Sequence, residues 1–283
     1  MSTSPISQRI DAHQHFWKYS AEEYRWIPHG SPLQRDCLPA DLAKEQAKIG
    51  LHGSIAVQAR QTLEETRWLL ELSDESPLIR GVVGWVDLRS DYVEDQLAEF
   101  VRHPKFVGVR HVVQDEPNDQ FMLEPDFLGG IEALREFGLT YDILIYPRQL
   151  PAAIELVRTF PEQPFVLDHI AKPDIKAGTI SPWREQIREL AAAPNLLCKV
   201  SGLVTEADHR AWKPDDFRPY LDLIFETFGP DRLMFGSDWP VCLLAANYEQ
   251  TFALVDEYTR SLSPSAREAF FGGNATRFYG VDD

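Results

Sequence analysis

The sequence is poor in cysteine and in basic residues, and it contains no long apolar run. Its three cysteines, Cys37, Cys198 and Cys242, are too few and too scattered for a disulfide framework or a cysteine-rich zinc site. Lysine and arginine number 28 against 44 aspartates and glutamates, so the net charge of −16 repels nucleic acid and anionic membranes. No segment approaches the roughly 18 apolar residues that cross a bilayer. We therefore expect neither nucleic acid nor a membrane as a partner.

The first residues, MSTSPISQ, also lack the basic start and the apolar stretch of a signal peptide. These absences indicate a cytoplasmic protein. The length of 283 residues suits one α/β barrel, for which about 250 residues is typical. We expect a single domain over residues 1–283, and the sequence is compatible with a homo-oligomer without specifying one.

Short β-rich runs alternate with longer amphipathic segments along the chain. Most of the runs are continuously apolar, as parallel strands covered on both faces are. The eight predicted strands are Arg9–His15, Gly53–Gln58, Arg80–Asp87, Phe106–Val112, Leu139–Ile145, Phe165–His169, Leu196–Ser201 and Arg232–Asp238. Eight strand–helix units in one domain favour a closed (β/α)8 TIM barrel of the α/β class over an open doubly wound sheet.

Three segments depart from this alternation: Phe16–Pro39, Gln114–Glu124 and Thr205–Pro214. Each follows a predicted strand, so each is expected at the carboxyl-terminal face of the barrel, where barrel enzymes carry their active sites. Thr62 with Glu65 forms a capping-box pattern at the start of one of the intervening helices.

Titratable residues stand at the end of the first predicted strand. His13 and His15 are two residues apart, so in a strand they face the same side. Two imidazoles at that end can bind a metal, polarise a carbonyl or move a proton. The alternative is a pair of surface histidines near a strand end.

Two later strands end in the same way. Asp168 and His169 close the sixth run, where a buried charge would need a partner, and Asp238 closes the eighth. Barrel closure makes the eighth strand a neighbour of the first, which places Asp238 beside His13 and His15. A carboxylate with imidazoles around one opening is a general acid–base arrangement. The alternatives are an ordinary strand-to-loop transition and a helix cap at Asp238.

Six motifs in order cover nearly the whole chain: DAHQHFW, GVRH, LDHIAKP, KVSGL, FGSDWP and GNATRFY. Together they resemble the amidohydrolase superfamily. Within it they resemble the sugar-lactonase branch of L-fuconolactonases and L-rhamnonolactonases, to which pyrone dicarboxylate lactonases are related. The resemblance implies that His13 and His15 are the first-strand pair, that His169 is the later strand histidine, and that Asp238 activates water.

The sequence departs from the ligand pattern of the metal-dependent members of this superfamily. These usually add a carboxylated Lys, a Glu or a second His from a middle strand. The middle strands here offer Arg110, His111, Tyr141 and Asp142 instead. We therefore expect no required cofactor. Zn2+ could still bind in a mononuclear site built from the four motif residues, His13, His15, His169 and Asp238.

Five further residues are candidates for substrate binding. Arg110 and His111 are adjacent in a strand, so only one can point inward, and we favour Arg110 over His111 as a ligand of a carbonyl or hydroxyl. An inward Lys199 could stabilise an oxyanion, whereas an ion pair at the outer wall is the alternative. Trp17 and Trp239 directly follow strand ends, where they could stack on a sugar or pack the rim.

The sequence thus predicts a hydrolase that opens a small-molecule lactone derived from a sugar, such as L-fucono- or L-rhamnonolactone. Asp238 would deprotonate the water while the histidines, with Arg110 or Lys199, hold the developing negative charge. One alternative is a metal-dependent decarboxylase or hydratase of the same superfamily acting on an unsaturated carboxylic acid. It needs more cationic residues than the strand ends supply. A second alternative is a catalytically silent, sugar-binding barrel.

Overall fold

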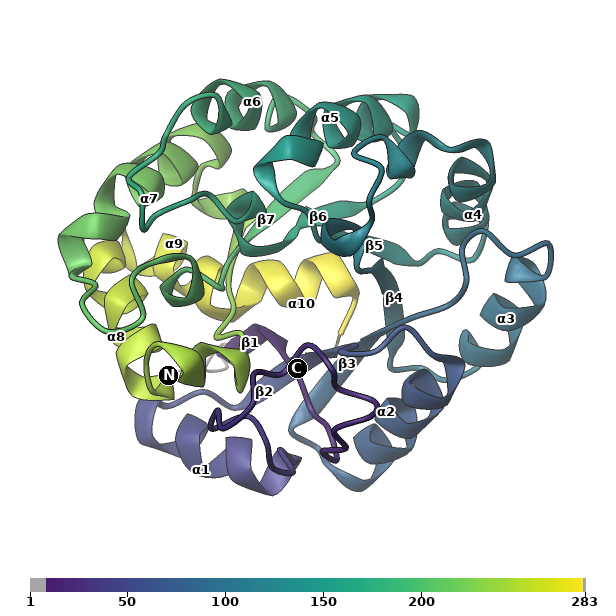
Figure 1. The fold of residues 1–283 in the computed structure, drawn as a ribbon, viewed down its shortest axis with the longest axis horizontal. Coiled ribbons are helices and arrows are strands. Elements are labelled where there is room, and N and C mark those ends of the chain that lie inside the picture. Colours follow the sequence, from purple (N-terminus) through teal and green to yellow (C-terminus); the bar gives the residue numbers. More distant parts are fainter. Residues whose placement is uncertain (1–8, 282–283) are drawn as a thin grey trace, which may run out of the picture.

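The computed structural model describes residues 9–281 and contains one eight-stranded parallel sheet in the order β1 to β8. Figure 1 shows the strands at the centre and the helices around them. The strands are β1 (Ile10–Gln14), β2 (Gly53–Val57), β3 (Ile79–Gly84), β4 (Phe106–His111), β5 (Thr140–Ile143), β6 (Phe165–Leu167), β7 (Leu196–Val200) and β8 (Leu233–Phe235). The predicted (β/α)8 barrel is confirmed.

The barrel closes between β1 and the segment that follows β8. Gln14 and Trp239 form a parallel bridge there. The backbone N–H of His15 donates to the carbonyl of Trp239 at 2.7 Å, and the N–H of Asp238 donates to the carbonyl of His13 at 2.8 Å. Closure therefore joins the backbone of His13 directly to that of Asp238, and the backbone of His15 to that of Trp239.

The helices that follow the strands form the outer ring: α1 (Pro39–Ile49), α2 (Leu63–Glu75), α3 (Val93–Phe100), α4 (Pro125–Glu136), α5 (Leu150–Thr159), α6 (Trp183–Leu190), α7 (Pro214–Phe228) and α8 (Tyr248–Tyr258). Each buries an apolar face against the sheet, since one large cluster of buried side chains joins residues of both layers. Among the described residues, no helix combines the length and the hydropathy that a membrane span requires.

Two short helices end the chain, α9 (Pro264–Glu268) and α10 (Asn274–Tyr279), with a π-helical turn between them. Helix α10 lies across the middle of the barrel in Figure 1. Its Ala275 and Tyr279 belong to the same apolar cluster as Ile10 and Ala12, which begin β1. Helix α10 therefore covers the amino-terminal end of the barrel and leaves the opposite end free for a site.

Several strands end earlier than predicted. β6 stops at Leu167 and β8 at Phe235, so His169 and Asp238 lie beyond the sheet. Both residues have left-handed backbone, with φ of 53° and 56°. An extended strand cannot contain such dihedrals, so the continuous apolar pattern overestimates these two strands.

Candidate active site

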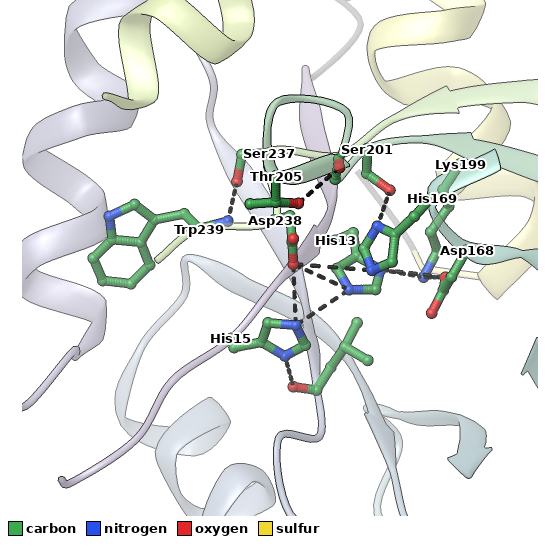
Figure 2. Close-up of polar contacts among 12 residues, drawn as sticks. His13, His15, Asp168, His169, Lys199, Ser201, Thr205, Ser237, Asp238 and Trp239 are labelled. Atoms are coloured by element: carbon green, nitrogen blue, oxygen red, sulfur yellow. Dashed lines mark hydrogen bonds and ion pairs between the residues drawn. The ribbon is translucent and has the colours of Figure 1, made fainter. Parts of the chain in front are cut away.

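His13, His15, His169 and Asp238 converge at the carboxyl-terminal end of the barrel (Figure 2). Oδ1 of Asp238 lies 3.3 Å from Nε2 of His15, 3.8 Å from Nε2 of His13 and 4.0 Å from Nε2 of His169. Nε2 of His13 and Nε2 of His15 are 3.3 Å apart. The structure thus brings together the four residues to which the sequence assigned the chemistry.

The first-strand pair enters the site through an irregularity in β1. Between Asp11 and Gln14 the register of β1 against β2 slips by one residue. Ala12 faces the apolar interior of the barrel, and the slip lets the next residue, His13, face the interior as well. His15 is then fixed by its Nδ1, which donates to the carbonyl of Val57 at 2.7 Å. Strand alternation alone would not place both Ala12 and His13 inside.

His169 begins a left-handed turn. Four consecutive non-glycine residues, His169 to Lys172, have φ between 48° and 59°. Each costs on the order of 1–2 kcal/mol relative to right-handed backbone, and such strain is typical of functional sites. Nδ1 of His169 contacts Oγ of Ser201 at 2.9 Å. Gly202 leaves room for the ring, because a Cβ there would come within 2.6 Å of Nδ1.

A buried ionic network lies beneath the histidines. Oδ1 of Asp168 is 3.3 Å from Nδ1 of His13 and 3.2 Å from Nζ of Lys199, and Oδ2 of Asp168 accepts from Arg110 at 3.1 Å. Lys199 also donates to Asp142. Two cations and two carboxylates therefore balance one another inside the barrel. Lys199 is fully buried in this network, neither at the cavity nor at the outer wall.

Burial and neighbouring groups set the ionisation of the site. Burial would raise the pKa of Asp238, but the surrounding imidazoles, His169 foremost, outweigh it and hold that pKa well below its usual range. Burial lowers the pKa of His169 to about 4, although Asp238 opposes the shift, and it lowers the pKa of His13 well below its ordinary value. At neutral pH the imidazoles of His13 and His169 are therefore neutral, and the Asp238 carboxylate is ionised.

The arrangement fits a divalent cation. Ligand atoms of His13, His169 and Asp238 all lie within 4.8 Å of one another. Oδ1 of Asp238 is buried and receives no hydrogen bond from the described residues, which is the environment of a carboxylate oxygen that awaits a cation or a water. His15 contacts His13 and Asp238 but is not part of this three-residue group.

A cavity of about 830 Å³ opens above these residues. His15, His169 and Asp238 line its floor, and Arg110 reaches it from β4. The other expected substrate ligand on β4, His111, does not line it. The His111 ring stacks on Phe121, with centroids 4.9 Å apart, and Nε2 lies 2.7 Å from the carboxylate of Glu116. Of the two adjacent residues, Arg110 is the one that points inward.

Trp17 and Trp239 do not line the cavity, so the structure does not place them where stacking on a substrate was expected. Nε1 of Trp17 donates to the carbonyl of Arg35 at 2.9 Å, and the indole is fully buried. Trp239 packs edge-on against Phe16 and points away from Asp238 in Figure 2. Both rings are packed into the rim of the barrel, because the segment Phe16–Pro39 folds back over them.

Sequence reasoning missed several residues of the cavity wall. Trp26 lines the cavity with 44% of its surface exposed and is held edge-on against Trp17, with ring centroids 5.6 Å apart. Tyr146 and Lys172 also line it, with Nζ of Lys172 5.5 Å from the Tyr146 ring centroid. Lys172 could have been identified as a site candidate from its place in the LDHIAKP motif. The local sequence of Trp26, in contrast, does not distinguish it from the buried Trp17 and Trp239.

Comparison with known proteins agrees with this geometry. The family model described as amidohydrolase matches residues 10–281. The chain is 44% identical to an L-fucono-1,5-lactonase of Burkholderia multivorans, over 97% of each protein, and 40% identical to one of Burkholderia ambifaria, over 97% of this chain and 96% of that protein. A crystal structure of an amidohydrolase from Burkholderia multivorans with bound zinc has a TM-score of 0.93 and 43% identity, covering 97% of this chain and all of that one. The chain therefore belongs to the amidohydrolase family.

Proposed function

We propose that this protein hydrolyses a sugar-derived lactone, with L-fucono-1,5-lactone as the leading candidate substrate. The observation that carries the proposal is Asp238, a residue that lines the cavity and whose buried Oδ1 receives no hydrogen bond from the described residues. It is free to accept a proton from a water molecule in the cavity. The two lactonases at 40–44% identity favour this substrate class.

The geometry suggests the following course. Asp238 takes a proton from water, and the hydroxide adds to the lactone carbonyl. Arg110, which lines the cavity and is held by Asp168 and by Oε1 of Gln58 at 2.9 Å, faces the position where the oxyanion develops. When the ring C–O bond breaks, the leaving alkoxide takes the proton from Asp238.

Zinc held by His13, His169 and Asp238 would supply a Lewis acid and lower the pKa of a bound water. We propose that hydrolysis does not require it. A lactone is an activated ester, and the site already holds a carboxylate base with cationic and imidazole groups around the reacting oxygen. His15, which contacts Asp238 from outside the three-residue group, can orient the water in either case.

The charge distribution favours a neutral substrate over a dicarboxylate. The cavity contains the cations Arg60, Arg110 and Lys172, more than the strand ends suggested. Each is paired: Arg110 with Asp168, Arg60 with Glu23 and Glu65, and Lys172 with Glu206 at 3.9 Å. Little uncompensated positive charge remains for the carboxylates that a decarboxylase of this superfamily would bind.

We infer a cytoplasmic enzyme whose residues 1–283 act as one domain and whose partner is a small-molecule lactone. The absence of a nucleic acid partner follows from the net charge of −16. A homo-oligomer stays compatible with the sequence.

The test is a panel of lactones in a pH-indicator assay, since hydrolysis releases a proton. The panel contains L-fucono-1,5-lactone, L-rhamnono-γ-lactone and 2-pyrone-4,6-dicarboxylate, each assayed with and without chelator. We expect turnover of the sugar lactones and little of the dicarboxylate. Binding of sugar lactones without turnover of any would instead support the silent sugar-binding barrel.

A further inference from the structure

Arg110 stands in an unusual place for a cation next to a metal-capable site. Its side chain is buried, and Nη1 lies 3.3 Å from Nε2 of His13. The same Nη1 donates to Oδ2 of Asp168 at 3.1 Å, and Nη2 donates to the side chain and the carbonyl of Gln58. The guanidinium is thus fixed against an imidazole nitrogen that the metal group would also use.

Nε2 is the nitrogen of His13 that a metal would take. Nδ1 points the other way, 3.3 Å from both Oδ1 of Asp168 and Nζ of Lys199. Nε2 faces Oδ1 of Asp238 at 3.8 Å. A ligating imidazole presents one lone pair to the metal while its other nitrogen is held by a carboxylate, which is the orientation that Asp168 supports here.

We propose that Arg110 and zinc compete for Nε2 of His13, so that the guanidinium sets the zinc affinity of the site. One lone pair cannot serve a hydrogen-bond donor and a metal ion at once. A positive charge 3.3 Å from a ligand atom also repels a dication in a buried, weakly screened environment. Nε2 of His13 therefore contacts either the guanidinium of Arg110 or a bound metal ion, but not both.

The network beneath the site permits the exchange. Asp168 keeps Lys199, 3.2 Å from its Oδ1, when the guanidinium moves away. Arg110 borders the 830 Å³ cavity, which gives the displaced group a place to go. Zinc binding then costs the contacts of Arg110 with His13 and Asp168 and leaves Lys199 as the shared cation of Asp142 and Asp168.

The experiment measures zinc binding directly, by calorimetric titration of metal-free protein and by the visible absorption of bound Co2+. We expect Arg110→Gln to bind zinc at least about tenfold more tightly than wild type. Arg60→Gln is the matched control, since Arg60 borders the same cavity but is held by Glu23 and Glu65 away from the histidines. It should change the dissociation constant by less than about threefold. Equal or weaker zinc binding by folded Arg110→Gln would overturn the proposal, as would equal tightening in both variants.

A second variant covers the case in which Arg110→Gln does not fold. Arg110→Lys keeps a positive charge opposite Asp168, but the shorter side chain withdraws the donor from Nε2 of His13. We expect a smaller tightening of zinc binding with an unchanged thermal midpoint in the absence of metal. If the Lys variant binds zinc no more tightly than wild type, the competition is refuted. The inference does not rest on the proposed lactonase activity, because neither readout involves turnover.

Discussion

The carboxylate of Asp11 on β1 accepts a hydrogen bond from the backbone N–H of Ser237, at 2.9 Å, across the seam where the barrel closes. The same oxygen accepts from the N–H of His13 at 3.2 Å, and the other oxygen accepts from the hydroxyl of Tyr248 at 2.9 Å. One buried side chain therefore fixes the backbone of His13 and that of the residue preceding Asp238.

Asp11→Ala should both destabilise the protein and slow lactone hydrolysis. The substitution leaves two buried N–H groups without an acceptor, which costs about 2–4 kcal/mol of unfolding free energy. It also loosens His13 and Asp238 together, so kcat should fall by about tenfold or more. Denaturant unfolding and steady-state kinetics measure the two effects. Tyr248→Phe is the control, since it removes one hydrogen bond to Asp11 and leaves both N–H contacts in place; a loss of kcat as large as that of Asp11→Ala would contradict this account.

Asp238→Asn preserves the shape of the side chain and removes the proton acceptor. We expect lactone turnover to fall by at least about a hundredfold, the scale of a general base, while circular dichroism and thermal unfolding stay close to wild type. Asn can still receive the imidazole contacts around Oδ1, so the fold should survive. Near-normal turnover by the folded variant would remove Asp238 from the mechanism.

Removal of metal should leave the activity in place. The protein is stripped with a strong chelator, elemental analysis establishes that zinc is below stoichiometric, and hydrolysis of L-fucono-1,5-lactone is then measured. We expect most of the activity to remain, because the carboxylate, the imidazoles and Arg110 supply the proton transfer and the charge stabilisation. Activity that disappears on stripping and returns in proportion to added Zn2+ would make the metal obligatory for hydrolysis.

The buried carboxylate of Glu65 makes other hydrogen bonds than those of the predicted capping box. Oγ1 of Thr62 does accept from the N–H of Glu65, at 3.2 Å, as a cap should. The Glu65 carboxylate instead accepts from the N–H groups of Ala59 and Arg60, at 2.9 and 2.6 Å, and so shapes the loop that brings Arg60 to the cavity. Burial raises the pKa of Glu65 to about 7, although these hydrogen bonds oppose the shift.

This raised pKa gives a pH dependence of defined sign. Between pH 4.5 and 7 the folded protein keeps a proton on Glu65 that the unfolded chain has released, so the unfolding free energy falls progressively over this interval and levels off above about pH 7. The loss is on the order of 3 kcal/mol. Glu65→Gln lacks this titration. From pH 4.5 to 7.5 the unfolding free energy of the wild type should therefore fall relative to that of the variant. A difference between the two proteins that does not change with pH would contradict the raised pKa of Glu65.

Trp26 should determine how well the cavity holds a sugar. Its exposed indole can stack on the C–H face of a lactone ring, and its contact with Trp17 keeps it in place. Trp26→Ala should lower kcat/KM for L-fucono-1,5-lactone by roughly tenfold, mainly through KM, since about 1.4 kcal/mol of binding is lost. Tyr92→Ala, an exposed aromatic outside the cavity, is the matched control. A fall carried by kcat alone would speak against stacking.

The sequence by itself determined the barrel and the residues around which the site is built. Eight apolar runs separated by amphipathic segments specify βα units, because parallel strands buried on both faces need continuous hydrophobicity. The histidines and Asp238 were recognisable because titratable residues at the ends of such strands are costly without a function. That only one of Arg110 and His111 points inward also followed from the sequence, since neighbours in a strand face opposite sides.

The tertiary structure decided what depends on partners distant in the sequence. Lys199 became part of an ionic network with Asp142 and Asp168, which no local pattern indicates. The division of the tryptophans between buried rim and cavity wall follows from how the segment Phe16–Pro39 folds back, and their local sequences do not distinguish them. The left-handed turn at His169 likewise needs the space beside Gly202, on a different strand end. Local sequence sets which residues reach the open end of the barrel, but long-range packing and charge balance set which of them face the substrate.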